Sequence, residues 1–470
     1  MNIILLEPTD VLFFRDGRPM GGALAGHSAA WPLPDVTNHA LHAALHRAGF
    51  EGTHQHRRGR SGTYGEQRDR RFGSLRSAGP YPVVGGDRWF FPRPADSAPA
   101  AKHSVEVTSL PVLGRSGDLP ALSDRGSLPK PLRHPVGALV PPSKEGGGEP
   151  WISSLAFSHY LGGGHCADAG APGATDFLKD ADVAALEARP GIGIDDETGV
   201  AGQGLAEGQY YTAHHLRLRD GIRLGVLAAA EDKGWLDSGH PSDLLGSLFG
   251  TPRTSIVVGG EQRVCSAVRR DAPDPLPLPL GLRGEKDFHQ LPDGRFAVKW
   301  VLLSPAVFPR VAAFTKDGKP QTAHCGGWLP NWVSETDGAV LLTSGPGAGK
   351  ARRAGARHGL KPSAPLAARL VAAIIPKPLV VTGWALPTAS DAGAGGAKSV
   401  HFAVPAGAVY YFAAESATAA AGLAAALNWH GPTAGSEIRN RRSTLLGEKG
   451  YGLGVCGTWS YHEDVPGRPQ

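Results

Sequence analysis

The stretch that decides the fold occurs twice in this chain. Residues 3–8 read I-I-L-L-E-P, and residues 300–305 read W-V-L-L-S-P. Each is a short apolar run closed by proline, which is typical of a buried strand that cannot extend its ladder further. A second apolar stub follows each run, at residues 11–14 and at residues 306–308. The repetition predicts that the chain consists of two similar halves.

The far end of each half repeats as well. Residues 244–249 are predicted to form a short helix, which leads through an apolar run at 256–258 into G-G-E-Q-R at 259–263. The alanine-rich run 417–429 predicts a second helix, later followed by G-E-K-G-Y-G-L-G at 447–454. A strand, then a helix, a glycine-rich loop and a closing strand, all present twice, indicate an α+β protein made of a duplicated βαββαβ unit.

Length and composition agree with two domains that carry insertions. The chain has 470 residues, which is more than one hydrophobic core usually supports. Alternating prolines at 271–282 predict an extended spacer, so we expect domains at 1–275 and 276–470. The 65 glycines and 40 prolines favour long loops, and we expect insertions within roughly residues 50–150. A net charge of +5 is too small to establish a polyanionic partner by itself.

Composition also argues against several classes of protein. The first apolar run ends within six residues and has no basic segment before it, so we expect neither a secretion signal nor a membrane span. The cysteines stand far apart and form no C-x-x-C pair, which argues against a zinc knuckle and a disulfide framework. They are Cys166, Cys265, Cys325 and Cys456. We therefore expect a cytoplasmic protein with reduced thiols and no cofactor.

Two motifs that suggest other functions are incomplete. Residues 345–350 resemble a phosphate-binding loop, but the first glycine and the final hydroxyl residue of that motif are missing. His39, His42 and His46 share one face of a helix predicted over 36–48, where they could bind a metal. No carboxylate or cysteine nearby completes a ligand set, so a polar helix face is the simpler interpretation.

The sequence F-F-R-D-G-R-P at 13–19 carries the strongest chemical signal. Its two phenylalanines are predicted to anchor a turn built on Asp16 and Gly17, and this turn presents Arg15 and Arg18. Two guanidiniums on one rigid turn suit bidentate recognition of phosphates or base edges. A solvated turn whose arginines pair with local carboxylates explains the same residues equally well.

Three basic runs favour a phosphate backbone as partner. They lie at residues 57–76, at 350–361 and around the glycine-rich segment 447–454. Any one of them would ordinarily be a solvated surface. Two of the three lie beside glycine-rich backbone, whose N–H groups can approach an RNA phosphate closely.

Longer stretches resemble one family. L-L-E-P-T-D-V-L-F-F-R-D-G-R-P at 5–19 resembles the opening of the third subunit of the Cmr complex, the type III-B CRISPR RNA-silencing assembly. The resemblance implies a repeat-associated (RAMP) protein with two ferredoxin-like (RRM-like) βαββαβ domains in tandem and long loop insertions. Further stretches agree in order along the chain outside the insertions, at 191–195 with Thr198, 209–218, 259–261 with Arg263, 375–384 and 404–412.

The resemblance also implies a function. Family members are non-catalytic RNA-binding subunits in antiviral defence, which hold the 5′ tag of the CRISPR RNA and join the large polymerase-like subunit to the backbone RAMP filament. The arginine turn would then recognise the tag, and the glycine loops with their basic neighbours would hold phosphates. The expected RNA-binding residues are Arg15, Asp16, Gly17, Arg18, Gly259, Gly260, Arg263, Arg439, Arg441, Arg442, Lys449, Gly450, Tyr451, Gly452 and Gly454.

Two alternatives stay open at this level. RAMP relatives include metal-independent endoribonucleases that cut CRISPR repeats with a histidine as general base or acid. His27, His39, His42 and His214 are the histidines available for that chemistry in the first half. The other alternative is a purely structural adaptor that never touches RNA.

Overall fold

The structure is a computed structural model with two compact units. Unit 1 comprises residues 1–88, 180–271 and 380–401, and unit 2 comprises residues 89–179, 272–379 and 402–470. Residues 89–179, which the sequence analysis assigned to the first domain, thus cluster with unit 2. The structure describes residues 1–14, 25–26, 29–50, 74–99, 107–109, 112–113, 128–137, 149–162, 173–195, 197–201, 210–231, 242–250, 254–316, 319–321, 323–342, 366–385 and 396–461.

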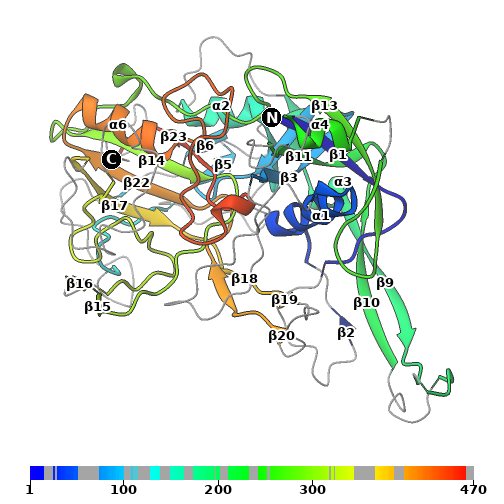
Figure 1. The fold of residues 1–470 in the computed structure, drawn as a ribbon. Coiled ribbons are helices and arrows are strands. Elements are labelled where there is room, and N and C mark those ends of the chain that lie inside the picture. The colour runs from blue at the N-terminus through cyan, green and yellow to red at the C-terminus, as the bar shows by residue number, and fades with distance from the viewer. Residues whose placement is uncertain are drawn as a thin grey trace. The chain divides into compact units, whose positions relative to one another are not determined.

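Unit 1 is built on an antiparallel sheet. Its central strand β1 (Asn2–Pro8) pairs with β13 (Val264–Asp271) on one side and with β11 (Ile222–Ala229) on the other. Beyond β11 lies β3 (Arg76–Val84), and beyond β13 lies β12 (Thr254–Val257). Helix α1 (Pro34–Arg47) follows β1, and α4 (Leu244–Leu248) follows β11. In chain order, the four main strands are therefore arranged fourth, first, third, second (Figure 1).

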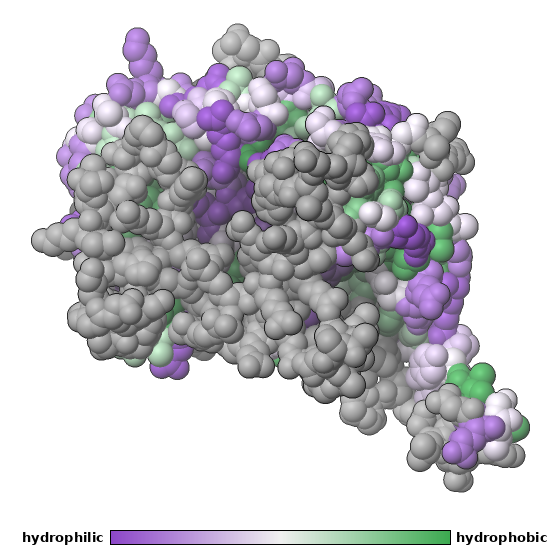
Figure 2. Space-filling model, in the orientation of Figure 1, coloured by the Kyte–Doolittle hydropathy of each residue, from purple (hydrophilic) through white to green (hydrophobic). Residues whose placement is uncertain are grey.

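A second, smaller sheet of unit 1 forms a long ribbon. Strands β9 (Ala184–Ile192) and β10 (Tyr210–Leu218) pair along their whole length, with β2 (Ala25–Gly26) beside β10. Figure 1 shows β9 and β10 running side by side as a long green ribbon. Ile194, just after β9, is 61% exposed, and Tyr210 is 57% exposed. Hydrophobic and hydrophilic residues meet at the end of this ribbon, at the lower right of Figure 2.

Unit 2 repeats the strand order of unit 1. Its central strand β14 (Phe296–Leu302) lies between β22 (Val409–Ala414) and β23 (Gly454–Gly457). Strand β17 (Ala368–Ile374) pairs with β22, and all neighbours are antiparallel. Helix α6 (Ala417–Leu427) connects β22 to β23. Among the residues between β14 and β17 that the structure describes, none is helical. The α+β class and the central position of both repeated strands are confirmed.

The remaining elements are short and belong mostly to the insertions. In the first part of the chain they are β4 (Arg88–Pro92), β5 (Ser97–Pro99), β6 (Val107–Ser109), β7 (Trp151–Ser153), α2 (Ser154–Leu161), η2 (Ala174–Asp176), β8 (Phe177–Leu178) and α3 (Asp180–Val183). In the second part they are η4 (Glu285–Asp287), β15 (Phe314–Lys316), β16 (Lys319–Gln321), β18 (Leu379–Val381), β19 (Trp384–Ala385), β20 (Gly396–Ala397), β21 (His401–Ala403) and η6 (Gly447–Lys449). No helix in the described part of the chain is long and apolar enough to cross a membrane.

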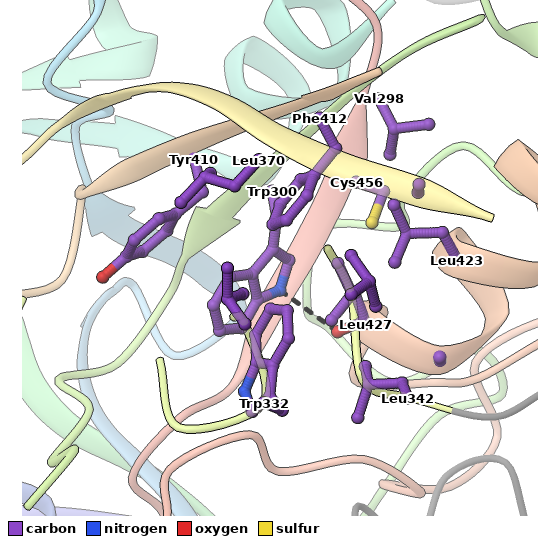
Figure 3. Packing of buried hydrophobic residues seen from close by; sticks show 14 of the residues in the cluster. Val298, Trp300, Trp332, Leu342, Leu370, Tyr410, Phe412, Leu423, Leu427 and Cys456 are labelled. Carbon is purple, nitrogen blue, oxygen red and sulfur yellow. Dashed lines mark hydrogen bonds between the residues drawn. The ribbon is translucent and has the colours of Figure 1, made fainter. Parts of the chain in front are cut away.

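The core of unit 2 explains why α6 forms where the sequence predicts it. Ser416 caps the helix by accepting a hydrogen bond from the Ala419 N–H, and the alanines after it favour helix and let it lie close to the sheet. Trp300 from β14 packs edge-on against Trp332, and its indole N–H donates to the Leu427 carbonyl at 3.2 Å (Figure 3). The last turn of α6 is thus satisfied by a side chain of the central strand.

A buried charge lies in the same strand. Lys299 on β14 is fully buried, with its Nζ 3.6 Å from Asp96 Oδ2 and 3.7 Å from the centre of the Tyr160 ring. Asp96 also accepts hydrogen bonds from the hydroxyls of Tyr160 and Tyr411, the latter at 2.9 Å. Burial lowers the pKa of Lys299, and Asp96 opposes that shift. The network therefore joins the segment around residue 96 to the sheet through a paired, hydrogen-bonded charge.

Candidate nucleic-acid interface

The expected arginine turn, Arg15 to Arg18, lies outside the described residues, but both of its ends are described. Before it, Leu12 exchanges backbone hydrogen bonds of 2.8 and 2.7 Å with Leu216 on β10. Of the two phenylalanines predicted to anchor the turn, Phe14 is buried and Phe13 is partly buried, and the Phe14 carbonyl accepts from the Ala29 N–H at 2.8 Å. The chain thus leaves and returns at one point on unit 1, which fixes both ends of the segment that carries the arginines.

The glycine loop at 259–263 packs directly on this anchor. The Gly260 N–H donates to the Phe13 carbonyl oxygen at 2.8 Å. Gly259 has a φ of +82°, and a Cβ placed there would lie 2.6 Å from the same oxygen. Glu261 and Gln262 also have left-handed backbone, with φ values of 54° and 50°. The two glycines are therefore required by close approach to Phe13, whatever ligand the loop binds.

Three charged or titratable side chains gather at the base of this loop. His215 Nε2 lies 2.9 Å from Glu261 Oε2, and Arg263 Nη2 lies 2.6 Å from the same oxygen and 3.0 Å from His215 Nε2. The ring of Phe13 lies 5.4 Å from the His215 ring. Burial alone would raise the pKa of Glu261, but the hydrogen bonds from His215 and Arg263 outweigh it and lower that pKa.

Sequence reasoning did not identify His215. The histidine that the sequence offers on this strand is its neighbour His214, as one of those available for catalysis. Alternate residues of a strand point to the same face, and Ala213 and His215 are both buried on one face of β10. This alternation is a partial indication that His215 points inward. What makes His215 notable is its contact with Glu261, 46 residues away, and no local pattern reports such a contact.

A closed ring of ion pairs lies beside this site on β9 and β10. Arg189 contacts Glu187 at 2.7 Å and Asp10 at 2.9 Å, and Arg217 contacts the same two acids at 2.6 and 2.9 Å. The hydrogen bonds from Arg189 and Arg217 lower the pKa of Asp10. Each charge has two partners of opposite sign, so the ring holds the start of the 11–14 stub against the ribbon.

The second expected site, the C-terminal glycine loop, is mostly internal. Lys449, Gly450, Tyr451, Gly452 and Gly454 are all buried. A Cβ on Gly452 would lie 2.0 Å from the Ser443 nitrogen, and one on Gly454 would lie 2.2 Å from Trp300 Nε1. These glycines therefore let protein backbone and side chains approach one another in this structure.

The arginines beside that loop differ in exposure. Arg439 is exposed and contacts Glu437 at 2.6 Å, and Arg441 is partly buried. Arg442 is buried, and its Nε donates to the Ala426 carbonyl in the last turn of α6 at 2.5 Å. Burial lowers the pKa of Arg442 to about 9. Arg442 thus acts on a helix end in this structure, and Arg439 is the residue of the set that solvent reaches.

Three of the four histidines available for catalysis lie on described elements. His27 lies outside the described residues. His39 and His42 lie on α1, where the His42 and His46 Nε2 atoms are 2.9 Å apart. His214 lies on β10. A polar face on α1 remains the simpler interpretation of its three histidines.

One group of metal-ligating side chains comes together in unit 2. Ligand atoms of His324, Cys325 and Glu335 lie within 4.8 Å of one another. However, His324 Nε2 lies 2.9 Å from a backbone carbonyl, and its Nδ1 accepts from the Gly326 N–H at 3.0 Å and from the Asn331 amide at 3.1 Å. Burial and Glu335 raise the pKa of the Cys325 thiol to about 11. Both ring nitrogens already serve the protein, so we assign no metal to this group.

Comparison with known proteins adds family information. A family model described as CRISPR-associated protein (Cas_Cmr3) matches residues 4–459. No curated protein matches the chain. A chain of the cryo-EM structure of the Type III-B Cmr-beta bound to cognate target RNA and AMPPnP, state 1, matches with a TM-score of 0.38 and 11% identity over 87% of this chain and 86% of that one. A chain of the Type III-B Cmr-beta bound to cognate target RNA matches with a TM-score of 0.36 and the same identity and coverage.

Proposed function

The chain belongs to the Cas_Cmr3 family of CRISPR-associated proteins, and from that premise we propose that it is a non-catalytic RNA-binding subunit of a type III-B Cmr effector complex. In this role it holds the 5′ tag of the CRISPR RNA. It also links the large polymerase-like subunit to the backbone RAMP subunit, and it acts in antiviral defence in the cytoplasm. The breadth of the family match, which spans both units, supports a subunit that uses its whole length in the assembly.

We propose further that both units are ferredoxin-like domains. The support is their common topology, in which four antiparallel strands lie in the order fourth, first, third, second. Unit 1 also has a helix after its first strand and another after its third. Unit 2 has the equivalent of the second helix, α6. This arrangement puts a central strand end and a glycine loop close together in each unit.

One observation carries the RNA-binding proposal for unit 1. The Gly260 N–H holds the Phe13 carbonyl, so the glycine loop and the root of the arginine turn form one packed feature. The described residues before Arg15 are therefore fixed, and Arg263 lies on the adjoining loop. Asp16 and Gly17 are part of the proposed turn, and Gly259 and Gly260 bring the loop onto its described root at Phe13. Preorganised guanidiniums lose little freedom on binding a phosphate, which favours this site for RNA.

In unit 2 the proposed contacts are divided. Arg439 is proposed to meet RNA directly because it is exposed, and Arg441, which is partly buried, is proposed to contact RNA beside it. The buried members would support the segment that carries them. They are Arg442, Lys449, Gly450, Tyr451, Gly452 and Gly454.

The test of the proposal is binding of tagged and tag-scrambled CRISPR RNA to reconstituted complexes across a salt series. Arg15→Ala with Arg18→Ala should weaken binding of tagged RNA, with about 1.5–3 kcal/mol lost per charge-assisted bond. Lys350→Ala with Arg352→Ala removes the same charge and serves as control. It should cause a smaller loss that does not depend on the tag. Equal binding of tagged RNA by the Arg15/Arg18 variant and wild type at every salt concentration would refute a tag-binding role.

The absence of catalysis is tested separately. The purified chain should leave a repeat-containing RNA intact with or without magnesium. Specific fragments ending in a 2′,3′-cyclic phosphate, lost on substitution of one histidine, would establish the endoribonuclease alternative.

A further inference from the structure

The cluster of His215, Glu261 and Arg263 contains a conflict over one proton. His215 Nε2 faces a carboxylate oxygen at 2.9 Å and a guanidinium nitrogen at 3.0 Å. If Nε2 carries a hydrogen, it donates to Glu261 but opposes the N–H of Arg263. If it does not, it accepts from Arg263 but turns a lone pair toward Glu261. Neither tautomer of the neutral ring can form good hydrogen bonds with both Glu261 and Arg263. The arrangement therefore favours the loss of one of these two contacts.

Burial raises the cost of that conflict. The His215 side chain is 3% exposed, whereas those of Arg263 and Glu261 are 25% and 37% exposed. Among the described residues, His215 Nδ1 and Arg263 Nε have no hydrogen-bond partner. The imidazole is therefore fixed inside the unit, whereas the guanidinium and the carboxylate both reach solvent, so a phosphate in solution has access to the guanidinium.

The loop backbone holds Glu261 in reach of Arg263. The Val258 N–H donates to the Arg263 carbonyl at 2.8 Å, which closes the turn between β12 and β13. Left-handed backbone at Glu261 and Gln262 then sets the carboxylate beside the guanidinium two residues further on. Such backbone is unfavourable for residues with a side chain, so the turn adopts it at a cost that the surrounding contacts offset.

Among the described residues, the charges on the ribbon beside the cluster are paired with one another. Across the ribbon His215 lies opposite Glu187, which is bonded to Arg189 and Arg217. Both arginines also contact Asp10. Glu261 is thus the carboxylate in contact with Arg263, and it cancels the charge that the loop would otherwise present.

We infer that the Glu261 carboxylate competes with RNA for the Arg263 guanidinium. An RNA phosphodiester displaces the carboxylate from Arg263, and His215 then becomes the hydrogen-bond partner of the carboxylate. This inference rests on the proposed RNA-binding role of Arg263. In the free chain, the Glu261–Arg263 ion pair occupies the guanidinium. When Arg263 turns to a phosphate, His215 Nε2–H donates to Glu261, so the carboxylate keeps a partner and the loop keeps its shape. His215 is a positioning residue in this exchange, and Glu261 sets a threshold against weak, non-specific anions.

The test measures binding of the full-length chain to a fluorescein-labelled single-stranded RNA of mixed sequence. Glu261→Gln should tighten binding by roughly threefold to tenfold, the size expected for release from a partly exposed ion pair. The matched control is Asp293→Asn. This variant makes the same change in net charge. It also releases an arginine two residues after the acid, because Arg295 Nε lies 2.8 Å from Asp293. The control should change affinity much less than Glu261→Gln.

Two further variants separate the inference from the proposed function. Arg263→Gln should weaken binding, and the gain from Glu261→Gln should vanish in the Arg263→Gln background. His215→Phe should weaken RNA binding only when Glu261 is present. His215→Gln keeps an N–H donor and should therefore bind RNA as tightly as wild type. If Arg263→Gln leaves affinity unchanged, both the RNA contact and the inference fail. If Arg263→Gln weakens binding but Glu261→Gln behaves like Asp293→Asn, the inference alone is overturned.

Discussion

The backbone N–H of Gly260 donates a 2.8 Å hydrogen bond to the carbonyl oxygen of Phe13. These residues are far apart in the sequence, yet each constrains the other. The glycine loop can approach only because it lacks side chains at 259 and 260, where a Cβ would lie 2.6 Å from the Phe13 oxygen and 2.9 Å from the Phe13 ring. The root of the expected arginine turn and the glycine loop are thus one structural feature, and a change in either should disturb both.

The first prediction tests this relationship with one methyl group. Gly259→Ala adds a Cβ against the Phe13 carbonyl, at a residue whose φ is +82°. Gly49→Ala is the matched control, because Gly49 has the same φ of +82° and no atom within 4 Å of an added Cβ. We expect the control to lose about 1 kcal/mol from the backbone conformation alone.

Gly259→Ala should lose about 1–3 kcal/mol more, since the clash is with backbone that cannot rotate away. Urea unfolding of both variants measures the difference. Equal losses in the two variants would mean that the loop can move off Phe13 without cost.

The second prediction concerns the buried pair of Lys299 and Asp96. Asp96→Asn removes the carboxylate 3.6 Å from a fully buried ammonium, so we expect a loss of about 3–5 kcal/mol in the free energy of unfolding. Lys299→Met combined with Asp96→Asn should lose less than the two single variants added together, because no unpaired charge is left inside.

The exposed pair of Arg369 and Asp337, 2.6 Å apart, provides the control for that cycle. Asp337→Asn should cost less than about 1 kcal/mol, because water screens both charges. A small effect for Asp96→Asn as well would show that water reaches the Lys299 network.

The third prediction concerns how the free energy of unfolding changes at acidic pH. Burial, with a smaller contribution from the charge of Arg283, lowers the pKa of His430 from 6.5 to about 4. Its Nε2 accepts a hydrogen bond from the Gly281 N–H at 3.1 Å, which a protonated ring could not do. The unfolded chain therefore binds this proton at a higher pH than the folded chain does. The contribution of His430 to the free energy of unfolding is fully present above about pH 6.5 and is lost as the pH drops toward 4.

The loss over that interval should be about 3 kcal/mol for this one group. Urea unfolding from about pH 7 to about pH 4.5 measures it, and His430→Gln should flatten the dependence. His289→Gln, at an exposed histidine, should leave the profile unchanged. An unaltered slope in His430→Gln would assign the acid sensitivity to other groups.

Much of the fold follows from local sequence patterns. The apolar runs 3–6 and 300–302 lie in the central strands β1 and β14, because strands paired on both sides need apolar residues. Helix α6 was predicted over 417–429 and is observed at Ala417–Leu427, where Ser416 marks the start. Helix α1 was predicted over 36–48 and is observed at Pro34–Arg47. Such signals lie within a few residues of the element that they predict.

The environment of individual charges could not be predicted in the same way. Arg442 and Lys449 flank a glycine loop in the sequence, which favoured phosphate contact, yet both are buried. The acceptor of Arg442 is a helix-end carbonyl at Ala426, and the partner of Lys299 is Asp96, some 200 residues away. Whether a charged side chain points inward depends on partners of this kind, which are brought together only by the tertiary fold.

The last prediction decides what the C-terminal glycine loop is for. If its glycines serve internal packing, then Gly454→Ala should destabilise the fold, because a Cβ there would lie 2.2 Å from Trp300 Nε1. Gly452→Ala should do the same, since its Cβ would meet the Ser443 backbone and its φ is +77°. We expect each to lose about 2–4 kcal/mol in the free energy of unfolding.

Gly447→Ala is the control within the same loop. The atom nearest to an added Cβ there is the Arg441 Cβ at 3.6 Å, an ordinary contact, so stability should change by less than about 1 kcal/mol. RNA binding by all three variants is then compared at a temperature where each is folded. Internal packing predicts that each folded variant binds RNA about as tightly as wild type, because the glycines act only through the fold. A Gly454→Ala protein with wild-type stability that no longer binds RNA would instead show that the bare backbone of this loop meets the RNA itself.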